Sequence, residues 1–233
     1  MPAGRLSDVE LLDDYTGHVD PEGPAARRDL QAVTITKVSV GPMDNNAYVL
    51  VDKATGRTLL IDAANEADRL LDTVDTVGSR DQLKDLVTTH QHWDHVQALE
   101  AMTKELSPTT YAHPLDGPEL PVAPDETVGD DDQVRFGDSF VEVIHLDGHT
   151  PGSIALYYKD PEGTGHIFTG DSLFPGGHGK TATREHHDAL MNDLERKVFG
   201  RFDDDTWVYP GHGDDTTLGA ERPSLPEWRE RGW

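Results

Sequence analysis

The chain has 233 residues, with 44 acidic and 20 basic side chains, 12 histidines and no cysteine, and its formal net charge is −24. The lack of cysteine excludes disulfides, thiolate metal ligands and a cysteine nucleophile, so nitrogen and oxygen atoms must provide any metal ligands. A surface this acidic repels phosphate backbones, which argues against a nucleic-acid partner and against the activity of a nuclease.

The first part of the chain predicts a polar arm followed by strands and a helix. Residues 1–32 are polar and rich in proline and glycine, which predicts an extended or loosely packed arm. From residue 32 to 40, β-branched and polar residues alternate as in a strand. Two apolar runs within residues 47–62 flank a four-residue turn and predict a β-hairpin. Residues 66–77 are apolar at helical spacing, and Gly78 follows as a helix C-cap.

The next elements surround a cluster of histidines. An apolar run at residues 83–88 predicts a buried strand, and residues 96–106 have the apolar spacing of a helix. Between them lies Thr-His-Gln-His-Trp-Asp-His at residues 89–95. This motif therefore lies where a strand ends and a helix begins, which is where layered α/β folds usually place chemistry. A short strand at residues 109–112 and a loop rich in proline and aspartate at 115–132 follow.

The second half of the chain repeats this scheme. Strands are expected at residues 133–136, 139–146, 153–158, 166–169 and 206–209, and a helix is expected at 188–199. Strands interleaved with helices, without a long linker, predict a single sandwich-like α/β domain. We assign it to residues 33–222, preceded by the arm at 1–32 and followed by a C-terminal tail at 223–233.

Three more motifs follow predicted strands and resemble one another in design. They are Gly-His-Thr-Pro-Gly at 148–152, Gly-Asp-Ser-Leu-Phe at 170–174 and Pro-Gly-His-Gly at 210–213. Glycines around one His or Asp allow a sharp turn that points the side chain inward. A single motif of this kind predicts only a turn, but four strand ends with ligand residues indicate a site. Their seven nitrogen and oxygen ligands exceed the needs of one tetrahedral ion and suit two adjacent ions: His90, His92, Asp94, His95, His149, Asp171 and His212.

These four motifs, in this order, resemble those of the metallo-β-lactamase-fold hydrolase superfamily. The likeness is greatest to its glyoxalase II-like (hydroxyacylglutathione hydrolase-like) branch, in which Trp is also common at the position of Trp93. The resemblance implies a four-layer αβ/βα sandwich, of class α/β (α+β), with metals at one edge between the two sheets. It also implies that His90, His92 and His149 bind one divalent ion, that Asp94, His95 and His212 bind a second, and that Asp171 bridges them.

The resemblance further implies a hydrolytic reaction. Two cations roughly 3.5–4 Å apart share a water and lower its pKa from about 16 toward 7. The resulting hydroxide would attack a thioester or a related activated ester, and Asp94 would accept a hydrogen bond from this water. Asp94 and Asp171 are therefore the predicted catalytic residues. Zinc is the expected metal, with iron or manganese as alternatives.

The sequence predicts the identity of the substrate less precisely than that of the metal ligands. Glyoxalase II enzymes carry a basic C-terminal helical extension that binds glutathione, and the roughly 20 residues after the His212 motif are too short for one, which argues against glutathione thioesters. Trp228 and Trp233 are expected to pack on the body of the protein or on a second copy of the chain in a homodimer. The loop at 176–181 resembles a phosphate loop but has Phe174 where the Walker A motif needs glycine.

That loop is predicted to border the metal site. His178, Lys180 and Arg184 are candidates to bind an anionic group of the substrate, and a plain surface loop is the alternative. The remaining histidines are expected at the surface or in satisfied core positions.

Three alternative functions remain open. A lactonase would use the same ligands, and a mononuclear-iron dioxygenase of persulfides would use only His90, His149 and Asp171. A metal-binding protein without turnover is the third, and the intact ligand set argues against it. No apolar run approaches the roughly 18 residues of a membrane span, and the N-terminus lacks the apolar core of a secretion signal. We therefore expect a cytoplasmic protein with a small-molecule substrate and without a membrane partner.

Overall fold

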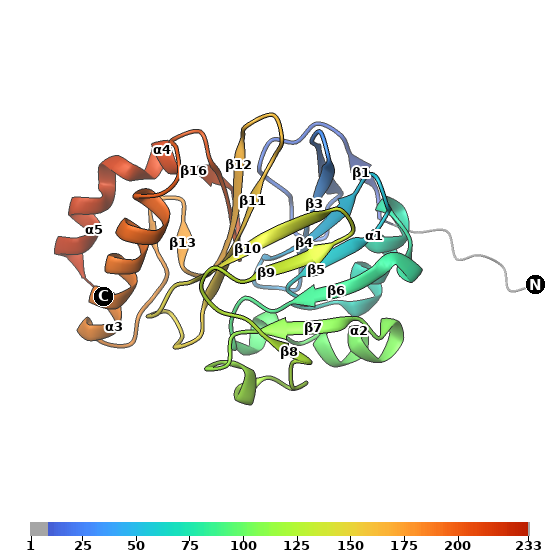
Figure 1. Cartoon of the computed structure of the whole chain (residues 1–233), viewed down its shortest axis with the longest axis horizontal. Coiled ribbons are helices and arrows are strands. Elements are labelled where there is room, and N and C mark those ends of the chain that lie inside the picture. Colours follow the sequence, from blue (N-terminus) through green and yellow to red (C-terminus); the bar gives the residue numbers. More distant parts are fainter. Residues whose placement is uncertain (1–8, 233) are drawn as a thin grey trace, which may run out of the picture.

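The computed structural model describes residues 9–232, in which two β-sheets lie face to face between two layers of helices (Figure 1). Strands of the first sheet are adjacent in the order in which they occur in the chain. They are β1 (Leu11–Leu12), β2 (Ala25–Asp29), β3 (Val33–Val40), β4 (Asn45–Asp52), β5 (Thr58–Ile61), β6 (Leu83–Val87), β7 (Thr109–Ala112) and β8 (Glu126–Thr127).

The strands β1 and β2 pair in parallel, and beyond them the pairing within this sheet changes from antiparallel to parallel at β5. From β2 to β5 the neighbours are antiparallel and are joined by short turns. From β5 to β8 they are parallel. Parallel neighbours need crossover connections, and α1 (Ala67–Val77) and α2 (Leu99–Leu106) provide the first two of these. The carboxyl ends of β5, β6 and β7 therefore share one edge.

The second sheet has the order β16-β15-β12-β11-β10-β9. Its strands are β9 (Gln133–Phe136), β10 (Ser139–His145), β11 (Ile154–Lys159), β12 (Gly165–Gly170), β15 (Trp207–Pro210) and β16 (Thr216–Thr217). A separate hairpin of β13 (Leu173–Phe174) and β14 (Gly177–His178) follows β12. The parallel connection from β12 to β15 contains α3 (Arg184–Asp193) and its π-helical continuation η4 (Leu194–Phe199). The chain ends with α4 (Leu218–Glu221), the 3₁₀ turn η5 (Arg222–Ser224) and α5 (Leu225–Arg231).

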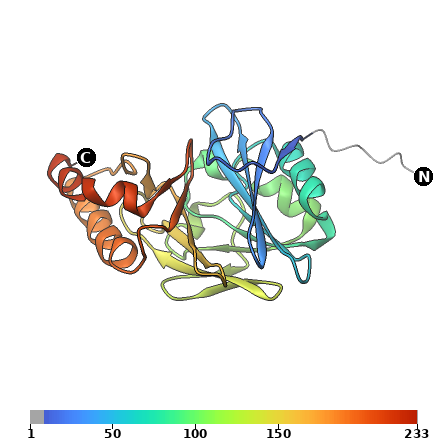
Figure 2. The ribbon, with the colours of Figure 1, turned by 90° about the horizontal axis from the view of Figure 1, so that it is seen from above.

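Apolar side chains form three layers of core between these four layers. Ile35, Leu50 and Phe168 belong to the cluster between the two sheets. The helices α1 and α2 cover the outer face of the first sheet, and α3 and α5 cover that of the second, an arrangement that Figure 2 shows from above. Because both faces of the central strands are covered, β4 is buried at every position. The predicted αβ/βα sandwich is confirmed.

Most helices and strands lie at the residues where the sequence patterns predicted them. The N-terminal segment differs from the prediction, because it is not a loosely packed arm. The part of the arm that the structure describes, from residue 9 onward, packs on the body of the protein. There β2 pairs antiparallel with β3, and Val19 and Ala25 are buried. The sequence Ala-Ala-Arg-Arg-Asp of β2 gives no strand signal, because its last three residues are polar and only partly buried or exposed. Residues 1–8 lie outside the described residues.

A buried ion pair anchors this segment to the far end of the chain. The Lys37 ammonium lies 2.7 Å from Asp215 Oδ1, and both side chains are 0% exposed. Lys37 also donates to the carbonyls of Gly17 (2.8 Å) and Gly213 (2.7 Å), while Tyr15 donates to Asp215 Oδ2 at 2.6 Å. A buried charge is tolerated when it is paired and fully hydrogen-bonded. This network joins the N-terminal segment, β3 and the loop that follows β15.

The C-terminal tail is a helix packed on the core. Trp228 of α5 is 1% exposed and its ring lies 6.4 Å from that of Phe199, which confirms that Trp228 packs on the body. Trp233 lies outside the described residues. Helix α3 begins at Arg184, four residues before the predicted start, because the Thr183 hydroxyl caps it by accepting the His186 N–H. Among residues 9–232, no helix combines the length and the apolar character needed to cross a membrane.

Candidate metal centre

The four ligand motifs meet at one edge between the two sheets. The first motif follows β6, and its last residues form the 3₁₀ turn η2 (Trp93–His95). The other three follow β10, β12 and β15 of the second sheet. Within the described residues, ligand atoms of His90, His92, His149 and Asp171 lie within 4.8 Å of one another, and those of Asp94, His95 and His212 form a second such group. All seven predicted ligands therefore lie in these two groups.

The second group has the dimensions of a metal site. The Nε2 atoms of His95 and His212 are 3.1 Å apart, and Asp94 Oδ2 lies 3.3 Å from His212 Nε2 and 3.7 Å from His95 Nε2. Two ligands at about 2.0–2.1 Å from a tetrahedral ion are themselves about 3.3 Å apart. These three side chains are therefore spaced as ligands of one ion.

Asp171 lies between the two groups. Its Oδ1 is 3.3 Å from His95 Nε2, and its Oδ2 is 3.4 Å from His212 Nε2. The same Oδ2 is 3.6 Å from His149 Nε2 and 4.0 Å from His90 Nε2. One carboxylate thus faces histidines of both groups, which is the geometry that a bridging ligand requires.

The buried ring nitrogens are suited to a cation. The Nε2 atoms of His90 and His149 are buried without a hydrogen-bond partner among the described residues, and an unpaired buried polar atom is costly. Burial lowers the pKa of His90 well below its ordinary value and also lowers the pKa of His149. Neutral imidazole is the form that binds metal. The residues present therefore fit divalent metal ions.

The histidines of the centre favour the ionised form of Asp171, the carboxylate that lies between the two ligand groups. Burial opposes ionisation of Asp171, but the nearby imidazoles of His212 and His95, at 3.4 and 3.3 Å, hold the pKa of its carboxyl well below the usual range. Burial also opposes protonation of His95, yet Asp171 and Asp62 raise the pKa of His95 to about 10. A metal ion that binds His95 must therefore displace a proton, so metal binding is coupled to pH.

Each of four ligand histidines is oriented through its other ring nitrogen. An outer hydrogen bond of this kind fixes the tautomer and points Nε2 toward the metal. The Nδ1 partners are Thr89 Oγ1 for His90 (3.0 Å), Asp62 Oδ2 for His95 (3.0 Å), the Lys180 carbonyl for His149 (2.8 Å) and the Met43 carbonyl for His212 (2.9 Å).

Asp62 is a site residue that the sequence analysis missed. It is buried, with a φ of 59°, and accepts hydrogen bonds from the N–H and hydroxyl of Thr89, both at 2.7 Å. Asp62, His90 and His95 also form a possible metal-binding group by distance. Asp62 contacts the Nδ1 of His95, whereas the Nε2 of His95 faces His212, so Asp62 orients a ligand from behind. Its only sequence signal is a carboxylate at the end of an apolar strand.

The loop predicted to bind an anionic group does border the centre. A Cβ atom on Gly179 would lie 1.6 Å from the Asp171 carbonyl, so only glycine fits there. The three predicted side chains are not brought together, however. His178 is buried with its Nδ1 2.7 Å from the Gly179 carbonyl, and Arg184 forms an ion pair with Asp188 at 3.0 Å. The exposed Lys180 contributes its carbonyl to His149.

Apolar side chains from three separate segments of the chain lie near the ligands. Trp93, between two ligands in the chain, is 63% exposed, and Met43, whose carbonyl holds His212, is 47% exposed. The Phe174 ring lies 6.4 Å from the His212 ring. A hollow of about 360 Å³ is lined in part by Gln91, Trp93 and Val96. None of the seven ligands lines this hollow, so the apolar surface near the centre is that of Trp93, Met43 and Phe174.

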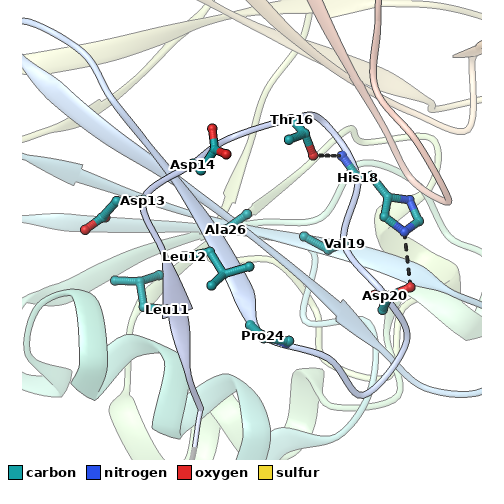
Figure 3. Close-up of a pocket in the computed structure, with 10 residues that line it drawn as sticks. All are labelled: Leu11, Leu12, Asp13, Asp14, Thr16, His18, Val19, Asp20, Pro24 and Ala26. Carbon is teal, nitrogen blue, oxygen red and sulfur yellow. Dashed lines mark hydrogen bonds and ion pairs between the residues drawn. The ribbon is translucent and has the colours of Figure 1, made fainter.

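A second hollow, of about 460 Å³, lies within the N-terminal segment at residues 11–26 (Figure 3). None of the seven ligands lines it. His18, at its rim, is tied to Asp20 at 3.2 Å and to Asp214 at 2.6 Å. This hollow is therefore separate from the metal centre.

Comparison with known proteins agrees with this geometry. A family model described as the metallo-beta-lactamase superfamily matches residues 40–212. A hydroxyacylglutathione hydrolase from Ruegeria pomeroyi is 36% identical over 186 residues, which are 78% of this chain and 66% of that protein. The chain thus spans about two thirds of the length of that relative.

Two solved structures extend the likeness to three dimensions. The crystal structure of ETHE1 from Myxococcus xanthus matches with a TM-score of 0.71 and 27% identity, covering 84% of each chain. The crystal structure of TTHA1623 in a di-iron-bound form matches with a TM-score of 0.67 and 32% identity, covering 82% of this chain and 98% of that one.

Proposed function

Because the chain belongs to the metallo-beta-lactamase superfamily, as its four motifs predicted, we propose that it is a dinuclear metal-dependent hydrolase of thioesters or related activated esters. The observation that carries this proposal is the position of Asp171, within 3.3–3.6 Å of histidines from both ligand groups. The likeness of the chain to a hydroxyacylglutathione hydrolase supports a substrate with an ester or thioester bond.

The ligands divide between two ions in this proposal. His90, His92 and His149 would hold the first, Asp94, His95 and His212 would hold the second, and Asp171 would contribute to both. Nitrogen and oxygen ligands suit zinc and iron. We propose zinc, and the likeness to a di-iron-bound protein makes iron the alternative.

The chemistry of the centre is divided between the ions and the protein. When bound, a pair of divalent ions provides a hydroxide nucleophile at neutral pH and polarises the substrate carbonyl. Asp94 would orient the attacking water by accepting a hydrogen bond from it, and Asn45 holds this carboxylate by donating to Asp94 Oδ2 at 3.0 Å. Asp171 keeps the two ligand groups at a fixed separation and contributes negative charge between them.

The surroundings of the centre favour an uncharged, partly apolar substrate. Trp93, Met43 and Phe174 offer apolar contact surface. The net charge of −24 opposes the approach of an anion such as a glutathione conjugate. Arg184, one of the residues predicted to bind an anion, is paired with Asp188. We therefore propose a thioester with an apolar acyl group.

Hydrolysis of a substrate panel tests this proposal. Metal-loaded protein is assayed with acyl thioesters, aryl esters and acyl-lactones, and with a persulfide while oxygen uptake is recorded. We expect the best thioester to reach a kcat/KM on the order of 10⁴ M⁻¹ s⁻¹ or more, within the usual range for enzymes. Asp171→Asn protein purified in the same way controls for contaminating esterases.

Each other outcome points to a named alternative. A lactone hydrolysed faster than every thioester would replace the thioesterase with a lactonase. Oxygen uptake with a persulfide at one iron per chain would favour the dioxygenase that uses His90, His149 and Asp171. If fully metal-loaded protein turns over none of these substrates, the result would favour the alternative of a metal-binding protein without catalytic activity.

A further inference from the structure

A single buried carboxylate, that of Asp116, is hydrogen-bonded to both loops that carry the first ligand group. Asp116 follows β7 and is 1% exposed. Its Oδ2 accepts the Gln91 N–H at 2.9 Å and the Thr150 hydroxyl at 2.6 Å, and its Oδ1 accepts the Gly152 N–H at 2.7 Å. Gln91 lies between two ligand histidines, and Thr150 directly follows a third.

The two loops come from different sheets, so the chain itself does not fix their separation. His90 and His92 follow β6 of the first sheet, whereas His149 follows β10 of the second. One main-chain hydrogen bond, from the Ile154 N–H to the Thr89 carbonyl at 2.9 Å, also links the two sides. Asp116 adds three bonds on the loops themselves, which are the parts that hold the ligands.

The contact between Asp116 and the second loop is tight. A Cβ atom on Gly152 would lie 2.7 Å from both the N and the Oδ1 of Asp116. Such a distance is too short for any side chain, so glycine at this position permits the hydrogen bond to Oδ1. Burial, three short hydrogen bonds and this close approach all fix the Asp116 carboxylate between the loops.

We infer that Asp116 is a positioning residue for the first metal ion, because it sets the distance from His90 and His92 to His149. The second group is held by different partners, namely Asn45, Asp62 and the Met43 carbonyl. The inference depends on the metal centre of the proposed function and not on its substrate. Loss of Asp116 should therefore weaken the first site selectively.

The test measures Zn²⁺ affinity at each site in isolation. Asp116→Asn is introduced into His212→Ala protein, which keeps the first site, and into His149→Ala protein, which keeps the second. Asn retains one acceptor oxygen but turns an amide N–H toward one of the donors. By competition with a chromophoric chelator, we expect about a 10- to 100-fold loss of affinity in the first background. We expect less than about a threefold loss in the second, whose ligands have other partners.

Asp52 provides a matched control. It is also 1% exposed and also accepts from three uncharged donors, the N–H and hydroxyl of Thr55 and the hydroxyl of Ser139. None of these donors belongs to a ligand loop. Asp52→Asn should lower the unfolding midpoint as Asp116→Asn does, but it should leave Zn²⁺ affinity unchanged in both backgrounds.

Thr150→Val keeps the inference testable if Asp116→Asn does not fold. It removes one of the three donors to Asp116 with little change of shape, and it should weaken only the first site, by a smaller factor. The inference is overturned by unchanged Zn²⁺ affinity at the first site, by equal losses at both sites, or by an equal loss in the Asp52→Asn control. Because no substrate is used, failure of the proposed thioesterase activity would leave this result intact.

Discussion

Asp171→Asn protein is expected to lose at least about 10³-fold in kcat/KM, equivalent to about 4 kcal/mol of transition-state stabilisation. The reason is geometric and electrostatic. Asp171 faces His95 with one oxygen and faces His212 and His149 with the other. An amide cannot ligate through its nitrogen and brings no negative charge to a pair of cations, so the variant should also retain less than two metal ions per chain.

Thioester hydrolysis and metal content are measured on the same preparation, and circular dichroism verifies the fold. Asp52→Asn, which changes a buried carboxylate between the two sheets, serves as the control and should keep its activity. Retention of wild-type turnover by Asp171→Asn would show that this carboxylate does not bridge the metals.

Lys37→Met protein is expected to lose about 3–5 kcal/mol in its free energy of unfolding, the usual cost of breaking a buried ion pair by removing one partner. Lys37 and Asp215 are both 0% exposed and lie 2.7 Å apart. Removal of the ammonium leaves the carboxylate buried without its counter-charge. It also leaves the carbonyls of Gly17 and Gly213 without this donor.

Urea denaturation of the wild type, Lys37→Met and the double variant Lys37→Met/Asp215→Leu measures this effect. The double variant has no unpaired buried charge, so it should recover most of the lost free energy. A loss below about 1 kcal/mol in the single variant would mean that water reaches Asp215 and that the pair is not buried in solution.

The sequence predicted those parts of the fold whose signals are local. The hairpin of β4 and β5 has a short turn between two apolar runs, and α1 has a regular apolar spacing. The metal ligands could also be predicted from the sequence, because each lies beside glycine or within a dense histidine motif directly after a strand. Four ligand-bearing strand ends indicated that they converge on one site, whereas the assignment of each ligand to one of two ions came from the resemblance to a known superfamily.

The sequence could not predict contacts between residues far apart in the chain. Tyr15 and Asp215 are 200 positions apart, and their contact is part of what turns a polar segment into an ordered one. Asp62 and Asp116 are lone carboxylates without a flanking motif, and their partners lie 25 to 36 positions away.

The direction in which a side chain points also could not be predicted from the sequence. The predicted anion-binding loop does reach the metal centre, but burial turns His178 inward and Asp188 pairs with Arg184. Residue type suggested a role for these side chains, whereas their packing decides which atoms face the site. Lys180 illustrates the difference, since its contact with the centre is made by its carbonyl.

Titration of metal-free protein with Zn²⁺, with thioester hydrolysis recorded at each addition, tests the central claim most directly. The claim is that seven side chains from four loops hold two ions that act together. The expected curve starts without activity and reaches its plateau at two equivalents per chain. Full activity in metal-free protein, or a plateau at one equivalent, would contradict it.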